Sequence, residues 1–335
     1  MENNEEEIKT LTWQEFMRFR PEMYVGKLGD GSDIEDGVYA MLRGIINDAV
    51  DESQLGFGNQ IMVTLDGDRL TLRNFGRGLP FRKLEEKVSC VYTGGMCDPF
   101  YLPTLEYQTI CALSSEMTIE SYRDGTMKRI SASRGEINLN EDPVETDQPN
   151  GLFISFIPDK DIFGEYKLDA QIVSYILSIY AAGTPGLELT LYDKVYYHPD
   201  GIMGLFKEHK DVDLQNAIHV SNCVYDLVIA PVTGKEQGKI ISIVNGHLTL
   251  NGGPHVDALI EVLFDVLKIP QNEILQNDFY AKFHIYLHFL WTKSVLDSVT
   301  KFNDYFKADL KENLLSIFRE DCDKRRVFYE AITKQ

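Results

Sequence analysis

Three short segments near the start of the chain together contain carboxylates, two arginines and several glycines. They are Arg20–Gly26, Asn47–Glu52 and Asn74–Pro80. Carboxylate oxygens are hard ligands of the kind that Mg²⁺ takes beside phosphates, and a carboxylate that reaches a water molecule can act as a general base. Glycine turns bring backbone N–H groups close to phosphate oxygens. These residue types would suit a site for a metal ion and phosphate groups.

Hydrophobic periodicity predicts the elements that would position these segments. From Asp36 to Glu52 a helix is expected, because apolar residues recur at helical spacing. These residues are Val38, Met41, Leu42, Ile45, Ile46 and Ala49. The other face of that helix carries Gly44, Asp48 and Glu52, four residues apart, so the three would line one side. Two alternating strands at 61–65 and 70–72, joined at Asp66-Gly67, form a hairpin that leads into the third segment.

The remaining pattern predicts helices and strands in two halves. Strands are expected at 152–158 and 187–192 with a helix at 170–182, and further strands at 224–231, 239–245 and 283–289. A helix should follow 251–254, and a charged helix should run from about residue 304. We expect an arm and loop at 1–35, kept flexible by Gly26, Gly29 and Gly31, then one domain at 36–198 and another at 199–335. This mixture is typical of the α+β class.

The pair His284 and His288 suggests a metal site, because imidazole is a common ligand. In an alternating strand, however, residues four apart lie ~13 Å from each other. That separation is too long for two ligands of one zinc ion. We therefore expect the two histidines to cover a face of a sheet.

The composition argues against several classes of protein. The net charge of −19 over 335 residues makes direct binding to nucleic acid a poor fit, since such affinity comes largely from Lys and Arg on phosphates. Five cysteines without a C-x-x-C pair argue against a disulfide framework or a zinc site and for a reducing cytoplasm. The acidic start is no signal peptide, and no apolar run approaches the ~18 residues of a membrane helix.

In order and spacing, the three segments resemble the start of the ATPase subunit of type IIA DNA topoisomerases, the B subunits of gyrase and of topoisomerase IV. The stretch 8–31 looks most like the topoisomerase IV B subunit of Bacteroidetes-type bacteria. The resemblance covers nearly the whole chain. It implies a Bergerat (GHKL) ATPase-type α/β sandwich followed by a transducer domain of ribosomal-protein-S5-like α/β fold. The family's cleavage-domain motifs are absent from the sequence, so we expect a degenerate, truncated paralogue that does not cut DNA.

The resemblance also implies a role for each position of the nucleotide pocket, and several positions depart from it. Gly44 stands where the family has its glutamate general base, so no side chain can take a proton there. Asp48 stands at the position of the asparagine that holds Mg²⁺, and its carboxylate could still bind the metal. Asn74 replaces the aspartate that accepts the adenine amino group, which removes the charge from that hydrogen bond.

The phosphate-binding lid of the family is altered as well. The turn Gly94-Gly95 survives, but Met96 replaces the family's lysine. The loop from 98 to the Ala-Leu-Ser segment at 112–114 is shorter than in the family and contains no glycine. Its prolines and bulky residues cannot bring the backbone close to phosphates as glycines do.

Other positions of the family pattern are kept. Glu52 and Arg77 occupy positions that form an ion pair in the family, and Gly76 and Gly78 keep its tight turn. Lys301 matches the lysine that reaches the γ-phosphate, although the glutamine two positions before it is a valine here. The segment 251–257 resembles the transducer motif. The vestigial pocket implied by the resemblance is therefore Asp48, Glu52, Asn74, Gly76, Arg77, Gly78 and Lys301.

A shifted alignment is the alternative interpretation of the lost base. Asn47 would then be the metal ligand, and Arg43 would stand at the base position, which still supplies no base. The shift would also break the spacing to Asp51 and Glu52. Both alignments predict that hydrolysis is lost.

We therefore expect a non-hydrolysing pseudo-ATPase that acts as an interaction or regulatory module, with no cofactor or with weakly bound ATP and Mg²⁺. It would form a homodimer, or a heterodimer with a true B subunit. In the heterodimer it could reduce the removal of supercoils by the topoisomerase. One alternative is an altered but active ATPase in which Asp51, Glu52 or Glu106 replaces the base. Another is a sensor that binds ATP or a different ligand without hydrolysis.

Overall fold

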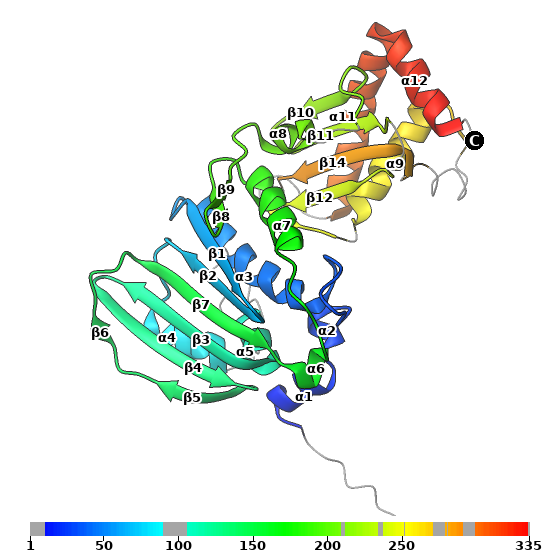
Figure 1. Cartoon of the computed structure of the whole chain (residues 1–335). Coiled ribbons are helices and arrows are strands. Elements are labelled where there is room, and N and C mark those ends of the chain that lie inside the picture. The colour runs from blue at the N-terminus through cyan, green and yellow to red at the C-terminus, as the bar shows by residue number, and fades with distance from the viewer. Residues whose placement is uncertain are drawn as a thin grey trace, which may run out of the picture. The chain divides into compact units, whose positions relative to one another are not determined.

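The computed structural model describes residues 11–89, 106–208, 212–233, 237–250, 252–270, 279, 281–290 and 299–333. The chain divides into two compact units, each built around a sheet of its own (Figure 1). The first unit is Met1–Leu177 with Leu187–Tyr196, and the second is Ser178–Gly186 with Tyr197–Gln335. The units interleave in sequence because helix α7 (Ala170–Gly183) begins in the first and ends in the second.

The first unit contains a nine-stranded mixed sheet in the order β5-β4-β3-β7-β2-β1-β8-β9, with β6 paired to β4. Strands β1 and β8 are parallel, and the other neighbours are antiparallel. The strands are β1 (Gln60–Asp66), β2 (Arg69–Asn74), β3 (Ser114–Arg123), β4 (Thr126–Ser133), β5 (Glu136–Asn140), β6 (Val144–Glu145), β7 (Gly151–Pro158), β8 (Glu188–Leu191) and β9 (Lys194–Tyr196). The predicted strands at 152–158 and 187–192 are confirmed as β7 and β8.

The predicted hairpin is confirmed as β1 and β2. Its register runs from Ile61 opposite Asn74 to Asp66 opposite Arg69, and alternate residues of both strands are buried. Gly67 takes a φ of 58° in the turn, a conformation that a residue with a Cβ rarely adopts. The register places Asn74 at the last position of β2, directly before the Gly76–Gly78 turn.

Helices α3 (Gly37–Gln54), α4 (Phe81–Ser89) and α5 (Glu106–Leu113) lie behind this sheet in Figure 1. Helix α3 confirms the predicted helix, and its six predicted apolar residues are all buried. Helix α5 is buried from Tyr107 to its end. The opposite face of the sheet is more open, since the side chain of Met62 on β1 is 41% exposed. The first unit is thus a two-layer α/β sandwich.

The N-terminal region contains two short helices that were not predicted from the sequence, α1 (Trp13–Phe19) and α2 (Glu22–Val25). Helix α1 begins with a capping box. The backbone N–H of Glu15 donates to the Thr12 hydroxyl, and the backbone N–H of Thr12 donates to the Glu15 carboxylate. This reciprocal pair satisfies two donors that a helix start otherwise leaves without acceptors.

The loop that follows α2 is not the flexible segment that we expected from its glycines. It wraps around Asp36, which is fully buried and whose carboxylate accepts the backbone N–H groups of Gly31 and Asp33. Lys27 lies 3.0 Å from the same carboxylate. A Cβ at Gly29 would lie 1.9 Å from Oδ1 of Asp36. The glycines here allow a close approach of the backbone to a buried charge, and that approach orders the loop.

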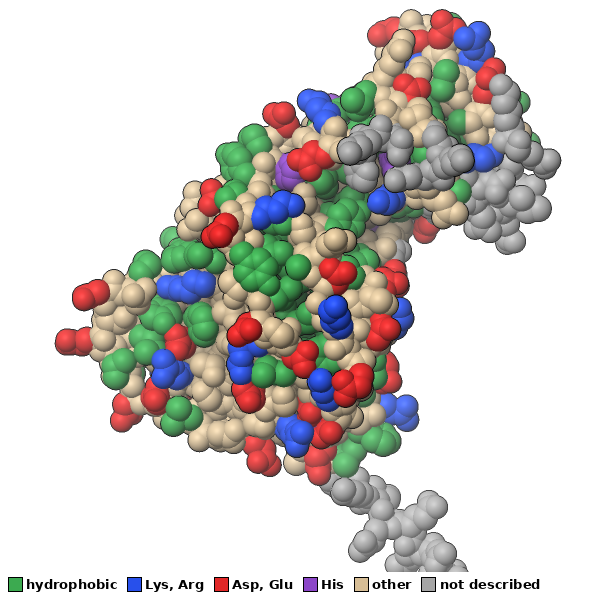
Figure 2. Space-filling view, in the orientation of Figure 1, with side chains coloured by type: hydrophobic (Ala, Val, Ile, Leu, Met, Phe, Trp, Pro, Cys, Tyr) green, Lys and Arg blue, Asp and Glu red, His purple; other side chains and the backbone are tan. Residues whose placement is uncertain are grey.

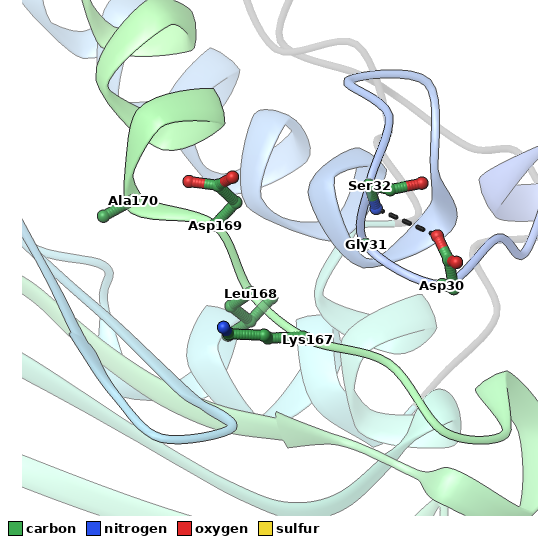
Figure 3. Close-up of a pocket in the computed structure, with 7 residues that line it drawn as sticks. All are labelled: Asp30, Gly31, Ser32, Lys167, Leu168, Asp169 and Ala170. Atoms are coloured by element: carbon green, nitrogen blue, oxygen red, sulfur yellow. Dashed lines mark hydrogen bonds between the residues drawn. The ribbon is translucent and has the colours of Figure 1, made fainter.

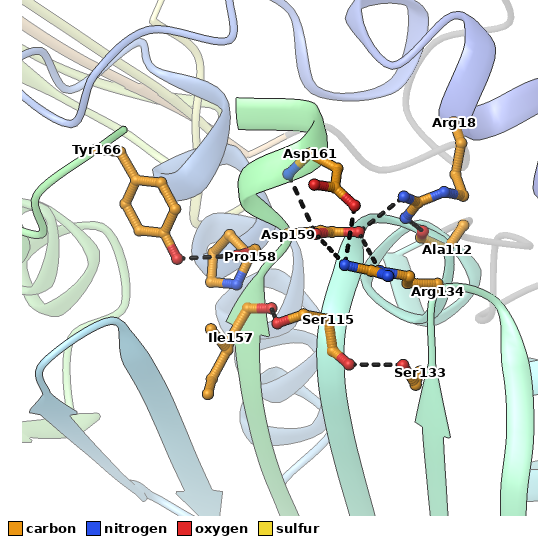
Figure 4. Close-up of polar contacts among 10 residues, drawn as sticks. All are labelled: Arg18, Ala112, Ser115, Ser133, Arg134, Ile157, Pro158, Asp159, Asp161 and Tyr166. Atoms are coloured by element: carbon orange, nitrogen blue, oxygen red, sulfur yellow. Dashed lines mark hydrogen bonds and ion pairs between the residues drawn. The ribbon is translucent and has the colours of Figure 1, made fainter. Parts of the chain in front are cut away.

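A network of ion pairs fixes α1 to the sheet (Figure 4). Asp159, whose side chain is 2% exposed, lies 2.7 Å from Arg18 and 2.8 Å from Arg134. Arg18 also donates to the carbonyl of Ala112 in α5, and Asp159 caps helix α6 (Lys160–Phe163). Burial raises the pKa of Asp159, but hydrogen bonds from Arg134, Arg18 and a backbone N–H outweigh it and hold the pKa below its usual value. Helix α1 is therefore part of the first unit's fold.

The second unit contains a five-stranded sheet in the order β10-β11-β14-β12-β13. Its elements are α8 (Gly201–Lys207), β10 (Ile218–Ser221), β11 (Tyr225–Pro231), β12 (Ile240–Val244), β13 (His247–Leu248), α9 (Pro254–Leu267), β14 (Phe283–Phe289), α11 (Val299–Glu320) and α12 (Cys322–Thr333). The three predicted strands and the helix after 251–254 are confirmed. The predicted terminal helix begins earlier, at residue 299, and a second helix follows it.

The two faces of this sheet carry different helices. One face packs on α9 and α11 in the main apolar core of the unit. On the other face, Phe206 of α8 contacts the ring of Tyr286 at 5.0 Å. His284 and His288 share that face with Tyr286 and are 0% and 7% exposed, so the prediction that they cover a sheet is confirmed. Burial lowers the pKa of His288 to about 4. Of the helices that the structure describes, none has the length and apolarity to cross a bilayer.

Candidate functional site

The predicted site begins on α3, where Gly44, Asp48 and Glu52 follow one another along one side of the helix. Gly44 and Asp48 are buried, and Glu52 is partly buried. The helix is held on its opposite side by its apolar residues, so these three positions have little freedom to move away. Side chains from α4, α5 and the turn after β2 surround them, and each of the three has a different neighbour.

Asp48 is bound by a lysine and a tyrosine. Its Oδ1 lies 3.2 Å from Nζ of Lys87 on α4, and its Oδ2 accepts a hydrogen bond from the hydroxyl of Tyr107 on α5. The ammonium group also lies 4.7 Å from the centre of the Tyr107 ring, within range of a cation–π contact. The Asp48 side chain is 9% exposed and that of Lys87 is 19% exposed. The charge of Asp48 is thus balanced by a cation that belongs to the chain itself.

Gly44 faces the side chain of Glu106, the first residue of α5. A Cβ at position 44 would lie 2.5 Å from Cγ and 3.2 Å from Cβ of Glu106. The shorter distance is well inside the contact distance of two carbon atoms that are not bonded. The stem of Glu106 therefore takes up the room that a side chain at position 44 would need. A carboxylate from α5 lies beside the place where the resemblance puts the carboxylate of α3.

Glu52 holds the turn that follows β2. Its Oε1 lies 2.6 Å from Nη2 of Arg77, and its Oε2 accepts from the Arg77 backbone N–H at 3.2 Å. The guanidinium also stacks over the ring of Phe57, 4.0 Å from its centre. The ion pair expected between Glu52 and Arg77 is present. A carboxylate engaged in this way orients a turn, and it is a poor candidate for a general base.

Glycine is required in that turn. Gly78 has a φ of 71°, and a Cβ there would lie 2.2 Å from the carbonyl oxygen of Tyr122. A Cβ at Gly76 would lie 3.0 Å from Oε2 of Glu52. Both glycines therefore serve the packing of the turn against its neighbours, whatever ligand the site takes.

Asn74 is 6% exposed and accepts two backbone hydrogen bonds. Its Oδ1 receives the N–H of Leu152 at 3.0 Å and that of Gly76 at 3.3 Å. Because both partners are donors, the oxygen of the amide must be the atom that faces them. The one acceptor of this side chain is thus used to join β2, β7 and the turn.

The arrangement of these residues does not fit a site in which Asp48 binds Mg²⁺ and a side chain of α3 acts as the general base for a water molecule. Both oxygens of Asp48 have partners from the chain, and the room beside Gly44 is filled by Glu106. Among the residues that the structure describes, no group of three or more His, Cys, Asp or Glu side chains is placed to hold a metal ion. Asp48, the one predicted metal ligand, instead forms an internal ion pair.

Several predicted positions lie elsewhere. The lid, with Gly94-Gly95 and Met96, lies outside the described residues, as does Asn251 of the transducer motif. Lys301 lies in the first turn of α11 in the second unit, and its side chain is outside the described part. His255, also in that motif, donates or accepts a hydrogen bond with Ser242 on β12, and burial lowers its pKa.

One pocket of the first unit contains none of the predicted site residues. It has a volume of about 460 Å³ and lies between the loop Asp30–Ser32 and the segment Lys167–Ala170. Figure 3 shows the carboxylates of Asp30 and Asp169 on its two sides, with the Asp30 carboxylate accepting the Ser32 backbone N–H at 3.0 Å. Both carboxylates are on exposed residues. No pattern in the sequence pointed to this pocket.

The surface turned to the viewer in Figure 2 carries acidic and basic side chains interspersed with hydrophobic ones.

The site residues that were not predicted from the sequence are Lys87 and Tyr107, which come from α4 and α5. Glu106 was named only as one alternative base. A lysine in an amphipathic helix is ordinarily a surface residue, so its sequence context does not distinguish it.

Curated relatives and solved structures place this geometry in context. The B subunit of DNA topoisomerase 4 from Borreliella burgdorferi is 30% identical over 277 residues, which are 79% of this chain and 46% of the relative. The 43K ATPase domain of Thermus thermophilus gyrase B aligns with a TM-score of 0.64 at 21% identity, covering 95% of this chain and 93% of that one. The ATPase and transducer domains of DNA topoisomerase II from Balamuthia mandrillaris align with a TM-score of 0.68 at 17% identity, covering 93% and 96%.

These similarities confirm the expected fold. The chain has the α+β architecture of a GHKL-type ATPase and transducer region, and the likeness extends over most of its length. The chain spans about half the length of the curated relatives it matches. No family model matches it.

Proposed function

We infer that this chain, which is similar to the B subunits of type IIA topoisomerases, is a non-hydrolysing relative of their ATPase. We propose that residues 36–198 form its ATPase-like domain and 199–335 its transducer-like domain, with an arm and loop at 1–35. In this proposal the protein acts as an interaction or regulatory module. The relatives' activity on DNA is not assigned to it.

The observation that carries this proposal is the pairing of Asp48 with Lys87. A divalent ion beside phosphates needs oxygen ligands that can turn toward it. Here the carboxylate at that position already has an ammonium group at 3.2 Å and a tyrosine hydroxyl on its other oxygen. To bind this carboxylate, Mg²⁺ would have to displace the ammonium group of Lys87 that already neutralises it. A site with a built-in cation has little use for Mg²⁺.

The neighbouring positions support the same conclusion. Gly44 supplies no base, and Glu106 fills the space beside it. The turn that contains Gly76, Arg77 and Gly78 is nevertheless intact and held by Glu52. Residues that shape the fold are kept, while the residues that would carry out hydrolysis are replaced or engaged.

A partner protein is the second part of the proposal. We propose that the chain forms a homodimer, or a heterodimer with a complete topoisomerase B subunit, in which it would reduce the number of working ATP sites. Size-exclusion chromatography with light scattering on the chain alone and in mixture with such a B subunit tests this. An inhibitory role predicts a complex and reduced ATP-dependent DNA relaxation. Separate elution with full relaxation activity would contradict it.

Hydrolysis is tested by phosphate release at high protein concentration with ATP and Mg²⁺. We expect no turnover above the buffer rate in the wild type or in Glu106→Gln. The matched pair also examines the alternative that the position of Glu106 favours, an active ATPase whose base comes from α5 and not from α3. Turnover in the wild type that disappears in Glu106→Gln would establish that alternative and end the proposal of a pseudo-ATPase.

A further inference from the structure

One outer edge of the first unit's sheet is formed by residues 136–147, which we call the acidic edge (Figure 1). It comprises β5, β6, the segment that joins them and the two residues after β6. All of its residues are exposed except Glu141 and Thr146, which are partly buried. It contains no lysine or arginine, and its carboxylates are those of Glu136, Glu141, Asp142, Glu145 and Asp147.

Most of these carboxylates are not neutralised by the chain itself. Glu141 lies 3.7 Å from Arg129, but Arg129 is engaged more closely by Glu120, at 2.7 Å. The remaining carboxylates of the acidic edge form no ion pair with a residue that the structure describes. A row of like charges without counter-charges attracts cationic groups and repels anionic ones.

Three large apolar side chains are exposed between these charges. Ile137, Leu139 and Val144 are 38%, 43% and 50% exposed. On β4, Leu139 is paired with Ser131. Val144 is paired with Met127, which lies on the same, less buried face of that strand. Leu139 and Val144 therefore stand on one face of the sheet, where apolar side chains can supply contact area to a partner.

The acidic edge is held in place by backbone hydrogen bonds. The N–H of Glu141 donates to the carbonyl of Arg129 at 3.1 Å, and the N–H of Thr146 donates to that of Gly125 at 3.0 Å. The hydroxyl of Thr146 also accepts the backbone N–H of Gln148 at 3.2 Å. A surface that is already ordered loses less conformational entropy when a partner binds.

The charge of the acidic edge limits the partners that fit it. Nucleic acid and anionic lipid surfaces carry charge of the same sign and would be repelled. A second copy of the chain that added its own β5 would place one acidic edge against another. A register shift between Ser131 and Ala132 also interrupts the pairing of β4 with β5, and bulges of this kind disfavour the addition of a further strand.

We propose that the acidic edge is a docking surface for a basic segment of another protein in which Lys or Arg side chains alternate with aliphatic ones. The cations would meet the carboxylates of Asp142, Glu145 and Asp147, and the aliphatic side chains would cover Leu139 and Val144. This surface shares no residue with the site around Asp48. The inference rests on the proposed role as an interaction module and is independent of the lack of hydrolysis.

The probe is a fluorescent decapeptide in which lysines alternate with leucines and valines. Fluorescence anisotropy with the full chain measures its affinity at low and at physiological ionic strength, and the higher ionic strength should weaken binding. A charge variant of the acidic edge combines Asp142→Asn, Glu145→Gln and Asp147→Asn. It should bind the peptide at least about fivefold more weakly than the wild type, because each exposed ion pair changes an affinity by up to about fivefold.

The matched control removes the same amount of charge from exposed positions elsewhere in the first unit, with Glu22→Gln, Glu35→Gln and Asp193→Asn. It should weaken binding by less than about twofold, because these carboxylates would not touch the peptide. Equal weakening by the two charge variants would indicate attraction to the net charge alone and would overturn the inference. Absence of binding to the wild type would overturn it as well.

Two valines of similar exposure test the apolar part. Val144 on the acidic edge is 50% exposed and Val195 on β9 is 53% exposed. Val144→Ser should weaken binding by about threefold or more, because it removes apolar area that the peptide would cover, and Val195→Ser should leave the affinity unchanged. Equal effects would contradict the inference, as would dimerisation of the chain alone that Val144→Ser abolishes, since this would assign the edge to a second copy. None of these results bears on phosphate release or on a complex with a B subunit.

Discussion

The substitution Gly44→Ala sets two opposing effects against each other in α3. In an open helix interior, alanine is more stable than glycine by about 1 kcal/mol. In this helix the new Cβ would lie 2.5 Å from Cγ of Glu106, and crowding that moves buried neighbours costs ~1–3 kcal/mol. We therefore expect Gly44→Ala to leave the free energy of unfolding of the first unit unchanged or to lower it by up to ~2 kcal/mol.

A second substitution separates the two effects. Glu106→Ala removes Cγ and leaves only the contact at 3.2 Å between the two Cβ atoms, which a small shift can relieve. In that background Gly44→Ala should show its helical advantage and stabilise the unit by up to ~1 kcal/mol. The coupling free energy of the double-mutant cycle is then ~1–3 kcal/mol, well above the error of such a cycle.

The chain has two compact units, so the assay must follow the unfolding of the first unit separately. Its two tryptophans are Trp13 and Trp291, and Trp13 begins α1 in the first unit. A Trp291→Phe background lets tryptophan fluorescence follow that unit through a urea transition for the four proteins of the cycle. Two results together would refute the steric explanation. Gly44→Ala alone, with Glu106 present, would stabilise the unit by the full ~1 kcal/mol, and the coupling free energy of the cycle would lie within ~0.3 kcal/mol of zero. Glu106 would then not occupy the space beside position 44.

Three further predictions concern charges. Lys87→Met leaves Asp48 without its cation, so the unfolding midpoint should fall by an amount that corresponds to about 2 kcal/mol or more. Millimolar Mg²⁺ should restore part of this lost stability in the variant and should not stabilise the wild type. Equal stabilisation of both proteins by Mg²⁺ would speak against the internal cation. Asp159→Asn should lower the free energy of unfolding by about 3 kcal/mol near neutral pH. Because the folded pKa of Asp159 lies below its usual ~3.9, this loss of stability should become smaller as the pH falls below about 4. A loss that stays constant down to pH 2 in urea melts would contradict this prediction. The pKa of His288 is lowered to about 4, so below pH ~6.5 the unfolded chain binds a proton that the folded chain does not. The free energy of unfolding should therefore fall by roughly 3 kcal/mol as the pH is lowered from ~6.5 to about 4. In the same urea melts His288→Phe should reduce this pH dependence, and an unchanged dependence would assign it to other groups.

Elements with a clear period could be predicted from the sequence, and those without one could not. Helix α3 and the hairpin of β1 and β2 each have a continuous apolar pattern on one face, and both were placed to within a few residues. Strands β3 and β4 were missed, because Glu120 and Lys128 are buried within them and a bulge shifts the register after Ser114. Charged residues at buried positions and an extra residue both interrupt the alternation on which a strand prediction depends.

The site shows the same division between local and distant information. The loss of a side chain at Gly44 and of a carboxylate at Asn74 could be predicted, because each is a property of one position in a recognisable motif. The partners that replace the lost functions could not, since Lys87 is 39 residues from Asp48 and Tyr107 is 59 residues from it. Pairings over such separations follow from the fold and leave no spacing in the sequence.

Helix α5 is held at both ends by contacts of different kinds. Near its C-terminal end, Arg18 of α1 donates to the carbonyl of Ala112, and at its N-terminal end Glu106 and Tyr107 face Gly44 and Asp48. Its 8 residues form a helix ~12 Å long. We expect a displacement of α1 to be transmitted through α5 to the Asp48 carboxylate on α3. Helix α1 and the Asp48 carboxylate are thus joined through a single short helix.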